Sequence, residues 1–316
     1  MTNDMISREN GLAITLPVET KSTGLRNGQK QVLRLAVLMT CYNRKQTTLK
    51  CLQTLAANTG LEEIELSVVL VDDGSTDGTA EAVKAQFPWV QVDVGSSNLF
   101  WCRGMHKACE IALQGGYDYY VWLNDDTLLY PDAVSRLLAC EQKLRLDHSA
   151  PVIVVGSSVD EKTGMLTYGG EMRVGRRNIR FRKVEMAEFP KRCDSMNGNI
   201  VLISAQAMGV VGNLDPAFEH AMGDTDYALR ANRLGVSVWT APGIFGECSH
   251  NSVPGTFIDS NLPLRQRWKA MMGRKGLPWR SWLVMTRRHC GWLWPVYFLR
   301  PYVRVVIESA MRGKLR

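Results

Sequence analysis

The chain has 316 residues, with 38 Lys and Arg against 31 Asp and Glu, a formal net charge of +7. Hydrophobic residues make up 45% and charged residues 22%, which excludes a disordered or fibrous protein. This length is about twice a typical domain, so the sequence predicts one large α/β domain with an appendage, or two smaller domains.

The eight cysteines are scattered along the chain without a C-x-x-C pair. A chain of this length needs no disulfides to fold, so we interpret them as reduced thiols of a cytosolic protein. The opening residues MTNDMISREN lack the basic start and apolar run of a secretory signal. No stretch approaches the roughly 18 consecutive apolar residues that a spanning helix needs. These features predict a cytoplasmic protein that is not threaded through a bilayer.

The charge is unevenly distributed. From Arg265 to Arg316 the sequence holds thirteen Lys and Arg and a single acidic residue, Glu308, so this segment carries +12 and the rest of the chain −5. Five of the nine tryptophans fall in it: Trp268, Trp279, Trp282, Trp292 and Trp294. Cations mixed with amphipathic aromatics suit an anionic lipid interface. Nucleic acid is the other polyanion that such a segment could bind.

Residues 1–31 are polar and aperiodic, and we expect a flexible arm there. The next 55 residues or so alternate between strand and helix patterns. A buried-type strand over 33–40 is followed by a helix with leucines at three-residue steps, and a second strand over 64–71 stops at DDGSTDG. A helix over 79–86 follows, with Asp77 as its expected N-cap.

The alternation then continues. We expect a helix over 103–113, a strand over 119–123, a loop to Tyr130 and a helix opened by Pro131. Strands that alternate with helices indicate crossover units and a mostly parallel sheet, whose ligands bind at the carboxyl ends of the strands. The polar loops 40–46, 72–78 and 124–127 all leave those ends, so their side chains should surround one crevice.

The second half has a looser pattern. Strands are expected over 152–156, 200–204 and 236–240, and hairpins in the Gly-rich, basic stretch 163–183. A helix over 224–234 is closed by Gly235. His250 follows a loop after the last strand.

Adjacent carboxylates stand out at two of the expected strand ends. Asp125 and Asp126 follow an apolar strand, and like charges side by side are costly to desolvate unless a cation binds them. A hard divalent cation that bridges carboxylates to substrate phosphates is a natural partner, while an ordinary polar turn is the alternative. Asp73 could accept hydrogen bonds from a ligand's ring or ribose donors.

Two common nucleotide-binding motifs are missing from the sequence, since neither G-x-G-x-x-G nor G-x-x-x-x-G-K-[ST] occurs. A phosphate-bearing ligand would therefore depend on a metal for neutralisation. Asp224 stands at the start of an expected helix, where it could cap the helix or act as a general base. Asp226 is expected to be structural and to pair with the backbone or with Arg230, four residues on.

Four fragments in this order resemble family 2 glycosyltransferases, which have the nucleotide-sugar-binding GT-A fold. They are LMTCYNR (38–44), VLVDDGSTDGT (69–79), VWLNDDTLLYPDA (121–133) and FEHAMGDTDYALRANRLG (218–235). The resemblance covers roughly residues 33–251. It implies an α/β fold with a Rossmann-like, mostly parallel sheet flanked by helices, here followed by a basic, aromatic helical appendage. The expected division is a catalytic domain over 32–258 and a C-terminal segment over 259–316.

The resemblance also implies roles for individual residues. Thr40 and Asp73 match positions that hold the nucleotide base, and Asp125 lies toward the ribose. The other residues expected to contact the nucleotide are Tyr42, Asn43, Asn98, Arg103 and Asn124.

Metal binding and catalysis are assigned in the same way. Asp126 matches the metal ligand, His250 matches a histidine that reaches the metal or the diphosphate, and Asp224 matches the base that deprotonates the acceptor. Trp101 could stack on a sugar. Two positions depart from the family pattern, because Asn124 and Gly223 stand where relatives often have acids. Relatives with these variants include proteins resembling bacterial rhamnosyl- or hexosyltransferases.

The implied activity is an inverting transfer from a nucleotide-sugar, dependent on Mg²⁺ or Mn²⁺, to a glycan or lipid-linked acceptor of bacterial surface polysaccharide synthesis. The expected location is cytoplasmic, at the inner face of the cytoplasmic membrane, with the C-terminal segment on its anionic surface. In the alternative for this segment, it packs on the catalytic domain and its cations are solvated. A catalytically inactive nucleotide-sugar-binding scaffold is the alternative function, and a nucleic-acid-binding protein ranks last because it leaves the carboxylates unexplained.

Overall fold

The computed structural model describes residues 32–175, 178–250 and 253–313. The arm expected over residues 1–31 lies outside this described part. From Leu33 onward the chain forms one compact unit that includes the C-terminal helices.

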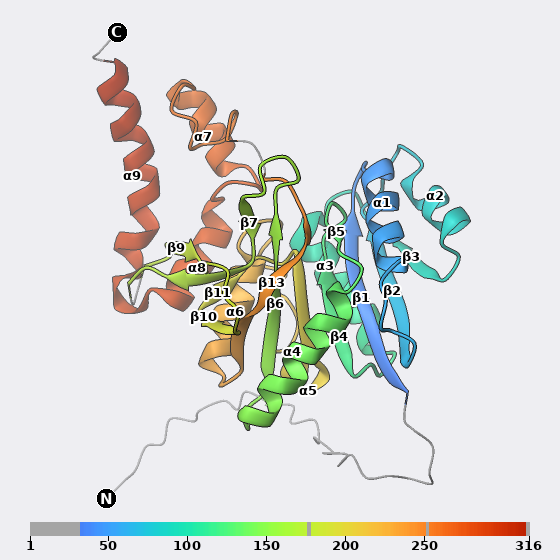
Figure 1. Cartoon of the computed structure of the whole chain (residues 1–316). Coiled ribbons are helices and arrows are strands. Elements are labelled where there is room, and N and C mark those ends of the chain that lie inside the picture. Colours follow the sequence, from blue (N-terminus) through green and yellow to red (C-terminus); the bar gives the residue numbers. More distant parts are fainter. Residues whose placement is uncertain (1–31, 176–177, 251–252, 314–316) are drawn as a thin grey trace, which may run out of the picture. The chain divides into compact units, whose positions relative to one another are not determined.

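A large mixed sheet runs through the described part of the chain in the order β10-β13-β6-β12-β4-β1-β2-β3 (Figure 1), with β5 paired to β13 and β7 to β6. Strands β4, β1, β2 and β3 are parallel, whereas β12 runs antiparallel to both of its neighbours. The strands are β1 (Leu33–Cys41), β2 (Ile64–Asp72), β3 (Val90–Val94), β4 (Tyr119–Leu123), β5 (Leu128–Leu129), β6 (Val152–Val159), β7 (Leu166–Tyr168), β10 (Lys191–Cys193), β12 (Ile200–Ser204) and β13 (Ser237–Glu247).

Helices cover both faces of this sheet. One buried cluster joins it to α1 (Lys45–Ala56), α2 (Thr79–Gln86) and α4 (Ala133–Asp147). The other joins it to α3 (Phe100–Leu113), α5 (Ala205–Val211) and α6 (Gly223–Arg233). Strands covered on both faces read as continuous apolar runs, which is why all five residues of β4 and of β12 are buried. The expected α/β class with a mostly parallel sheet is confirmed.

A small second sheet contains β11 (Ser195–Met196), β8 (Gly170–Arg173) and β9 (Phe181–Lys183) in that order. Strands β8 and β9 are antiparallel, as expected for a hairpin in the stretch 163–183. Strand β11 packs against α6, so this sheet lies beside the helix that carries Asp224.

Several local predictions were wrong or incomplete. The short elements β3 and α5 were missed, α3 begins three residues earlier than expected, and α4 begins at Ala133 rather than at Pro131. Asp77 is not the N-cap of α2, because Gly78 takes that place with a left-handed φ of 77°. The Asp77 carboxylate instead accepts the N–H groups of Thr79 at 3.1 Å and Lys45 at 3.0 Å, which ties together the starts of α1 and α2.

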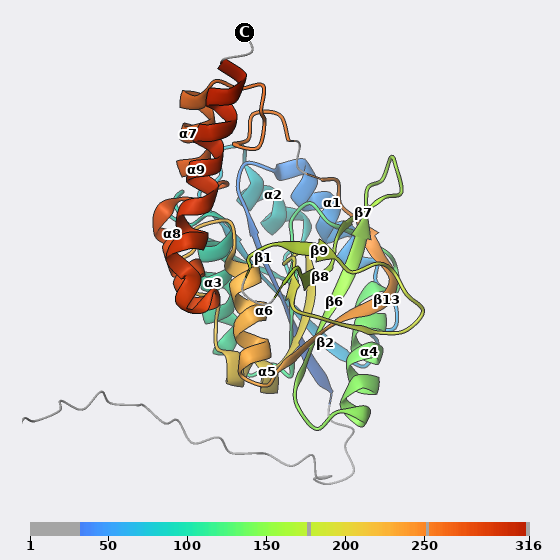
Figure 2. The same cartoon turned by 90° about the vertical axis from the view of Figure 1, so that its left-hand side faces the viewer.

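After the last strand of the large sheet, the chain forms α7 (Leu264–Met272), α8 (Trp279–His289) and α9 (Trp294–Gly313). Figures 1 and 2 show them on the side of the sheet that α3 and α6 cover. Trp282 of α8 and Tyr302 of α9 belong to the same buried cluster as α3 and α6. Among the described residues, no helix is long and apolar enough to cross a membrane.

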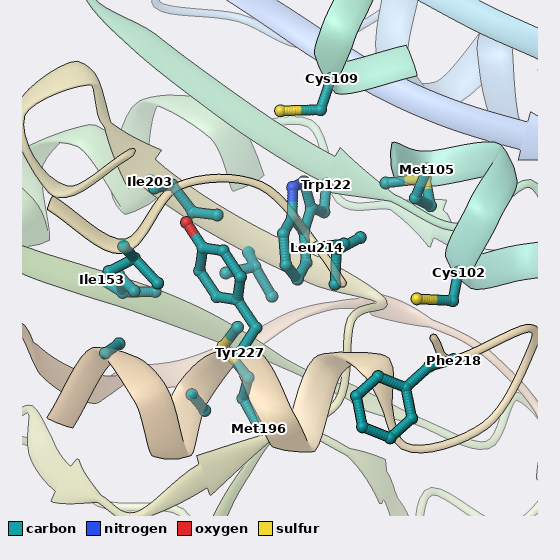
Figure 3. Close-up of a cluster of buried hydrophobic side chains, with 14 of the residues drawn as sticks. Cys102, Met105, Cys109, Trp122, Ile153, Met196, Ile203, Leu214, Phe218 and Tyr227 are labelled. Carbon is teal, nitrogen blue, oxygen red and sulfur yellow. The ribbon is translucent and has the colours of Figure 1, made fainter. Parts of the chain in front are cut away.

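The core beneath α6 is aromatic. Tyr227 of α6 packs against Trp122 of β4, with ring centroids 4.8 Å apart, and both rings are fully buried (Figure 3). The cluster also contains Phe218, Leu214 and Cys102 of α3. This packing fixes α6 against the centre of the sheet.

Asp226 of α6 joins the C-terminal helices to the large sheet and its covering helices. Its side chain is fully buried and accepts hydrogen bonds from Arg230 Nε at 2.9 Å, Arg288 Nη1 at 2.8 and 2.9 Å, and His289 Nε2 at 2.8 Å. Burial opposes ionisation, but the hydrogen bond from His289 and the two guanidinium groups lower the pKa of Asp226 below its ordinary value. The expected pairing with Arg230 is confirmed, and α8 is anchored on the same carboxylate.

Replacing this carboxylate should destabilise the whole unit. In Asp226→Ala, two guanidinium groups and His289 lose their buried counterion, and breaking such a pair costs about 3–5 kcal/mol. Urea unfolding followed by circular dichroism measures the loss. As a control, Glu65→Gln breaks the exposed ion pair with Arg34 and should change the free energy of unfolding by less than about 1 kcal/mol. Equal effects of the two substitutions would contradict a structural role for Asp226.

Candidate active site

The Asn124-Asp125-Asp126 segment directly follows β4 and faces a cation that the sequence analysis missed. Arg44, at the end of the loop after β1, places Nη1 3.1 Å from Asp125 Oδ1 and 2.7 Å from Asp126 Oδ2. The carboxyl ends of β1 and β4 are adjacent because these strands pair. A basic residue in the polar loop of the neighbouring strand was the feature from which this pairing could have been inferred.

Asp125 is only 6% exposed. Burial raises the pKa of its carboxyl to about 6, with the Arg44 guanidinium opposing the shift and the charge of Asp126 adding to it. Thr48 of α1 donates a hydrogen bond of 3.4 Å to its other oxygen. Arg44 and Thr48 together make it possible for a carboxylate to lie inside the protein at this position.

Trp101 lies between Asn124 and Asp224. Its indole N–H donates to Asn124 Oδ1 at 2.6 Å. Its ring packs on Gly198, where a Cβ would stand about 2.4 Å from ring atom Cζ2 and 3.5 Å from the Cβ of Asp224. Through these contacts the 124–126 segment, the Trp101 ring and Asp224 lie next to one another.

Asp224 lies in the first turn of α6. Its oxygens accept the N–H groups of Gly198 at 3.0 Å and Thr225 at 2.8 Å. Burial raises the pKa of this carboxyl, while those two backbone N–H groups oppose the rise. A fixed carboxylate with a raised pKa can accept a proton from a hydroxyl group. The helix N-cap is Met222, so Asp224 is not the cap.

Glu171 of β8 is a further acidic group that the sequence analysis missed. Strand β8 pairs with β11, with Glu171 opposite Ser195. Burial, followed by the negative charge of Asp224, raises the pKa of the Glu171 carboxyl to about 7, and the Lys183 ammonium opposes this shift. A glutamate in a short strand of a Gly-rich stretch carries no motif that points to a site.

Thr40 and Asp73 occupy the carboxyl ends of β1 and β2. The Thr40 hydroxyl donates to the carbonyl of Val71 at 3.0 Å and is nearly buried. Asp73 Oδ2 accepts the N–H groups of Leu99 and Phe100, both at 2.9 Å, just before α3. Its Oδ1 is buried and has no hydrogen-bond partner among the described residues.

The loops after β1 and β2 are joined by Asn43, which has a left-handed φ of 50°. Its side chain accepts the N–H of Thr76 at 2.7 Å, and its backbone donates to Ser75 Oγ at 2.8 Å. Tyr42 and Asn98 are exposed at the same end of the sheet.

Arg103 is turned toward the loop before α6. Its Nε donates to the carbonyl of Pro216 at 2.9 Å, and its Nη2 lies 3.6 Å from Glu219 Oε1. This side chain therefore links α3 to that loop.

The structure does not bring His250 into contact with Asp126. His250 is exposed, its Nε2 accepts from Lys183 Nζ at 2.6 Å, and its ring lies 5.1 Å from that of Tyr168. In the described part of the chain, no three His, Cys, Asp or Glu side chains gather closely enough to hold a metal ion.

The donor set nevertheless fits a cation that is shared with a substrate. Mg²⁺ in nucleotide sites is held by one or two carboxylates together with substrate phosphates. Asp126 supplies such a carboxylate, 32% exposed, with Oδ2 bonded to Arg44 and Oδ1 near the Cys248 thiol at 3.5 Å. A cation at Asp126 therefore competes with Arg44 for the same oxygen.

The family is shown by comparison with known proteins. The model for "Glycosyl transferase family 2" matches residues 36–197, which span half of the chain. The matched residues include the carboxyl ends of β1, β2 and β4. The chain therefore belongs to glycosyltransferase family 2, whose members transfer sugars from nucleotide-sugar donors.

Two curated relatives are bacterial proteins named for the synthesis of sugar-containing molecules. An N-acetylglucosaminyl-diphospho-decaprenol L-rhamnosyltransferase of Mycobacterium tuberculosis is 25% identical over 253 residues, covering 73% of this chain and 78% of that protein. A poly-beta-1,6-N-acetyl-D-glucosamine synthase of Staphylococcus epidermidis is 29% identical over 119 residues, covering 36% of this chain. The chain spans only 26% of the synthase's length.

A solved structure supports the fold. GalNAc-T7, crystallised with UDP, GalNAc and Mn²⁺, aligns with a TM-score of 0.52 and 15% identity, covering 67% of this chain and 42% of that chain. The expected GT-A-like fold is thereby confirmed.

The close contact at Gly198 leads to a prediction. In Gly198→Ala the new methyl group must displace the Trp101 ring, and overpacking of this kind costs about 1–3 kcal/mol. The displaced ring also loses its hydrogen bond to Asn124. Thermal unfolding measures the stability, and the red shift of tryptophan fluorescence reports the ring.

The matched control is Gly209→Ala in α5, where nothing lies within 4 Å of the added Cβ. Alanine is favoured over glycine in a helix by up to about 1 kcal/mol, so this variant should be as stable as the parent or more stable. A Gly198→Ala protein with unchanged stability and fluorescence would disprove the close packing of Trp101.

Proposed function

We propose that the chain is an inverting, metal-dependent glycosyltransferase that moves a sugar, rhamnose or a hexose, onto a hydroxyl of a glycan or lipid-linked acceptor. The observation that carries this proposal is the placement of Asp224. Its carboxylate is fixed by two backbone N–H groups beside Trp101, and Trp101 bonds to the segment of Asp125 and Asp126. A base and a leaving-group site thus adjoin one aromatic surface on which a sugar ring can lie.

The proposed reaction is a single displacement. Asp224 accepts the proton of the acceptor hydroxyl as its oxygen attacks the anomeric carbon, and the bond to the nucleoside diphosphate breaks on the opposite face. A divalent cation, Mg²⁺ or Mn²⁺, held by Asp126 would neutralise charge on the departing diphosphate. Arg44, once it releases Asp126, is a second cation beside that charge. His250, exposed after β13, is proposed to reach the metal or the diphosphate.

The nucleotide is proposed to lie over the carboxyl ends of β1 and β2. Asp73 supports this position because one of its buried oxygens has no hydrogen-bond partner in the described part of the chain, and so can accept from a base N–H. Asp125 is proposed to face the ribose. Tyr42, Asn43, Asn98, Arg103 and Thr40 are proposed to complete the contacts of this site.

The relatives support a proposal for the acceptor and for the cellular location. The mycobacterial relative is named as a rhamnosyltransferase that acts on N-acetylglucosaminyl-diphospho-decaprenol, and the staphylococcal relative as a synthase of poly-beta-1,6-N-acetyl-D-glucosamine. We propose an analogous role in surface polysaccharide synthesis, at the inner face of the cytoplasmic membrane. The basic segment 259–316 is proposed to contact the anionic surface there.

Removal of the proposed base distinguishes an enzyme from an inactive scaffold. Asp224→Asn should lower kcat about 10²- to 10⁴-fold, the usual contribution of general base catalysis. Nucleotide-sugar binding should persist, because the asparagine still accepts the N–H of Gly198. Transfer is measured with UDP-, dTDP- and GDP-sugars in Mn²⁺, and binding by thermal shift, since saturating ligand stabilises the folded state by about 2.7 kcal/mol at a hundredfold excess over Kd.

Asp132→Asn, on the exposed turn before α4, is the matched control and should keep full activity. An Asp224→Asn enzyme with unchanged turnover would refute the assigned base. Binding without turnover in the parent protein would favour the scaffold.

Glu171 should appear in the pH dependence of transfer. Its pKa lies near 7, and above that pH its charge adds to that of Asp224, which strengthens the base. The charged neighbour of opposite sign is Lys183. We expect kcat to rise through an ionisation near pH 7, and this ionisation to disappear in Glu171→Gln.

The control for this measurement is Glu161→Gln, which removes an exposed carboxylate outside the site. Its pH profile should match that of the parent. Identical profiles for the parent and Glu171→Gln would show that Glu171 does not titrate beside the base.

A further inference from the structure

Helix α9 presents an apolar face to solvent. Six large apolar side chains on it are between 42% and 63% exposed: Val296, Leu299, Val303, Val306, Ile307 and Met311. They recur at steps of three and four residues, so they lie along one side of the helix. Its other side is buried, with Tyr302 and Val305 in the core cluster. We call the exposed side the α9 face.

Helix α7 extends this apolar surface. Trp268 is 40% exposed and its ring lies 5.9 Å from that of Tyr302, at the margin of the α9 face. Leu264, one turn earlier in α7, is 39% exposed. Figure 2 shows α7 and α9 side by side, away from the sheet. A contiguous apolar surface of this extent is typical of a docking site rather than of a free surface.

Arginines border the α9 face. Arg300 lies one turn after Val296 on the same side of the helix, and Arg304 lies one turn further on, toward the edge of the apolar face. They also line a cavity of about 170 Å³ between α8, α9 and the loop at 178–180, where Arg180 is a third cation. Trp282, Tyr297 and Leu277 form its apolar wall, and no carboxylate is among the residues that line it. Arg304 Nε also donates to Glu308 Oε1 at 2.5 Å, so this guanidinium is already shared with a carboxylate. The guanidinium groups of Arg180 and Arg300 above the apolar wall suit the phosphate of an amphipathic molecule.

The positive charge around the α9 face favours an anionic partner. The segment 265–316 has thirteen cations and one acid. A second copy docked by a twofold axis would bring Arg300 and Arg304 toward the same residues of its partner, which like-charge repulsion disfavours. An anionic lipid leaflet instead offers an apolar interior beneath a layer of phosphates, which matches an apolar face bordered by arginines.

We propose that the α9 face is embedded in the interface of an anionic membrane and that Arg180 and Arg300 bind a lipid phosphate in the adjoining cavity. Helix α8, which connects this surface to the body, is fixed to α6 by Arg288 and His289 on Asp226. The membrane-facing surface is thus rigidly joined to the helix that carries Asp224. The inference deepens the proposed function by defining where a lipid-linked acceptor meets the enzyme.

Vesicle flotation of the full chain tests this inference. The parent should float with vesicles of equal parts phosphatidylcholine and phosphatidylglycerol, and stay in solution with phosphatidylcholine alone. Leu299→Asn/Val303→Asn should reduce flotation at least about tenfold, since two exposed apolar side chains lose their insertion. Arg180→Gln/Arg300→Gln should reduce it by a similar factor, because each arginine near an anionic surface contributes roughly fivefold.

Matched controls keep the result interpretable. Leu146→Asn/Met165→Asn changes two other exposed apolar residues, and Lys50→Gln/Arg145→Gln two other exposed cations. Both should float like the parent. Circular dichroism shows whether each variant is folded, and donor hydrolysis or thermal shift with nucleotide-sugar reports the catalytic site independently of lipid.

Equal flotation of the parent and the α9-face variants, or no flotation of the parent, would overturn the membrane surface. A dimer in analytical ultracentrifugation that Leu299→Asn/Val303→Asn dissociates would assign the face to a second copy instead. Failure of flotation with intact nucleotide-sugar binding would leave the proposed transferase standing, whereas loss of binding in the parent would count against the transferase alone.

Discussion

The buried carboxylate of Asp226 is the constraint that unites the two parts of this molecule. Two arginines and a histidine converge on it, one from α6 itself and two from α8. Such an arrangement adds little net stability compared with an apolar core, but it is costly to break, so it specifies geometry. Because Asp224 precedes Asp226 by two residues, the ion cluster that anchors the C-terminal helices also fixes the turn that holds the candidate base.

Several cations of the C-terminal segment serve this internal purpose. Arg288 bonds to Asp226 and Asp215, Arg274 to Glu219, and Arg267 to Glu308. The pairs of Arg288 and Arg274, three in all, join the positive segment to the mildly acidic body. The opposite net charges of the two parts therefore help to hold them together, in addition to any effect on binding partners. Arg304, at the border of the α9 face, is paired with Glu308 as well. Arg300 makes no ion pair with the described residues, so it is the cation that remains for an external anion.

Electrostatics at the strand ends follows a similar rule. Two adjacent acids suggested a metal because buried like charges need a cation. The structure answers this requirement with Arg44, whose sequence distance from Asp125 is 81 residues. Only the parallel pairing of β1 with β4 brings them together. Because the chain itself supplies this counterion, the carboxylates are stable in the absence of a ligand. A metal ion that binds Oδ2 of Asp126 would have to displace Arg44 from that oxygen.

The parts that sequence predicted are those governed by local physics. Apolar runs that end in polar loops gave β1, β2, β4 and the crossover helices, since these runs have one buried environment from end to end. The short elements β3 and α5 were missed because five to seven residues carry too little periodicity to distinguish them from loops. Helix α2 begins at Thr79 as predicted, but Asp77 was misassigned as its N-cap because Gly78, with a left-handed φ, directly precedes the first helical residue. Arg44 and Glu171 gain their importance only from tertiary neighbours, which no local pattern contains.

The glycine at position 223, where relatives often have an acid, has an explanation in packing. A Cβ at this position would stand about 2.3 Å from Cys102 Sγ, so the close approach of α6 to α3 excludes any side chain there, and an acid above all. That approach is the same one that places Asp224 beside Gly198 and Trp101. A second carboxyl still lies near the base, because Glu171 reaches the same region from β8 and interacts with Asp224 electrostatically. Glycine at position 223 is therefore required by the close packing of α6 on α3. The candidate site still has two carboxyl groups, Asp224 and Glu171, from different elements of the fold, and this favours the proposed transferase over an inactive scaffold.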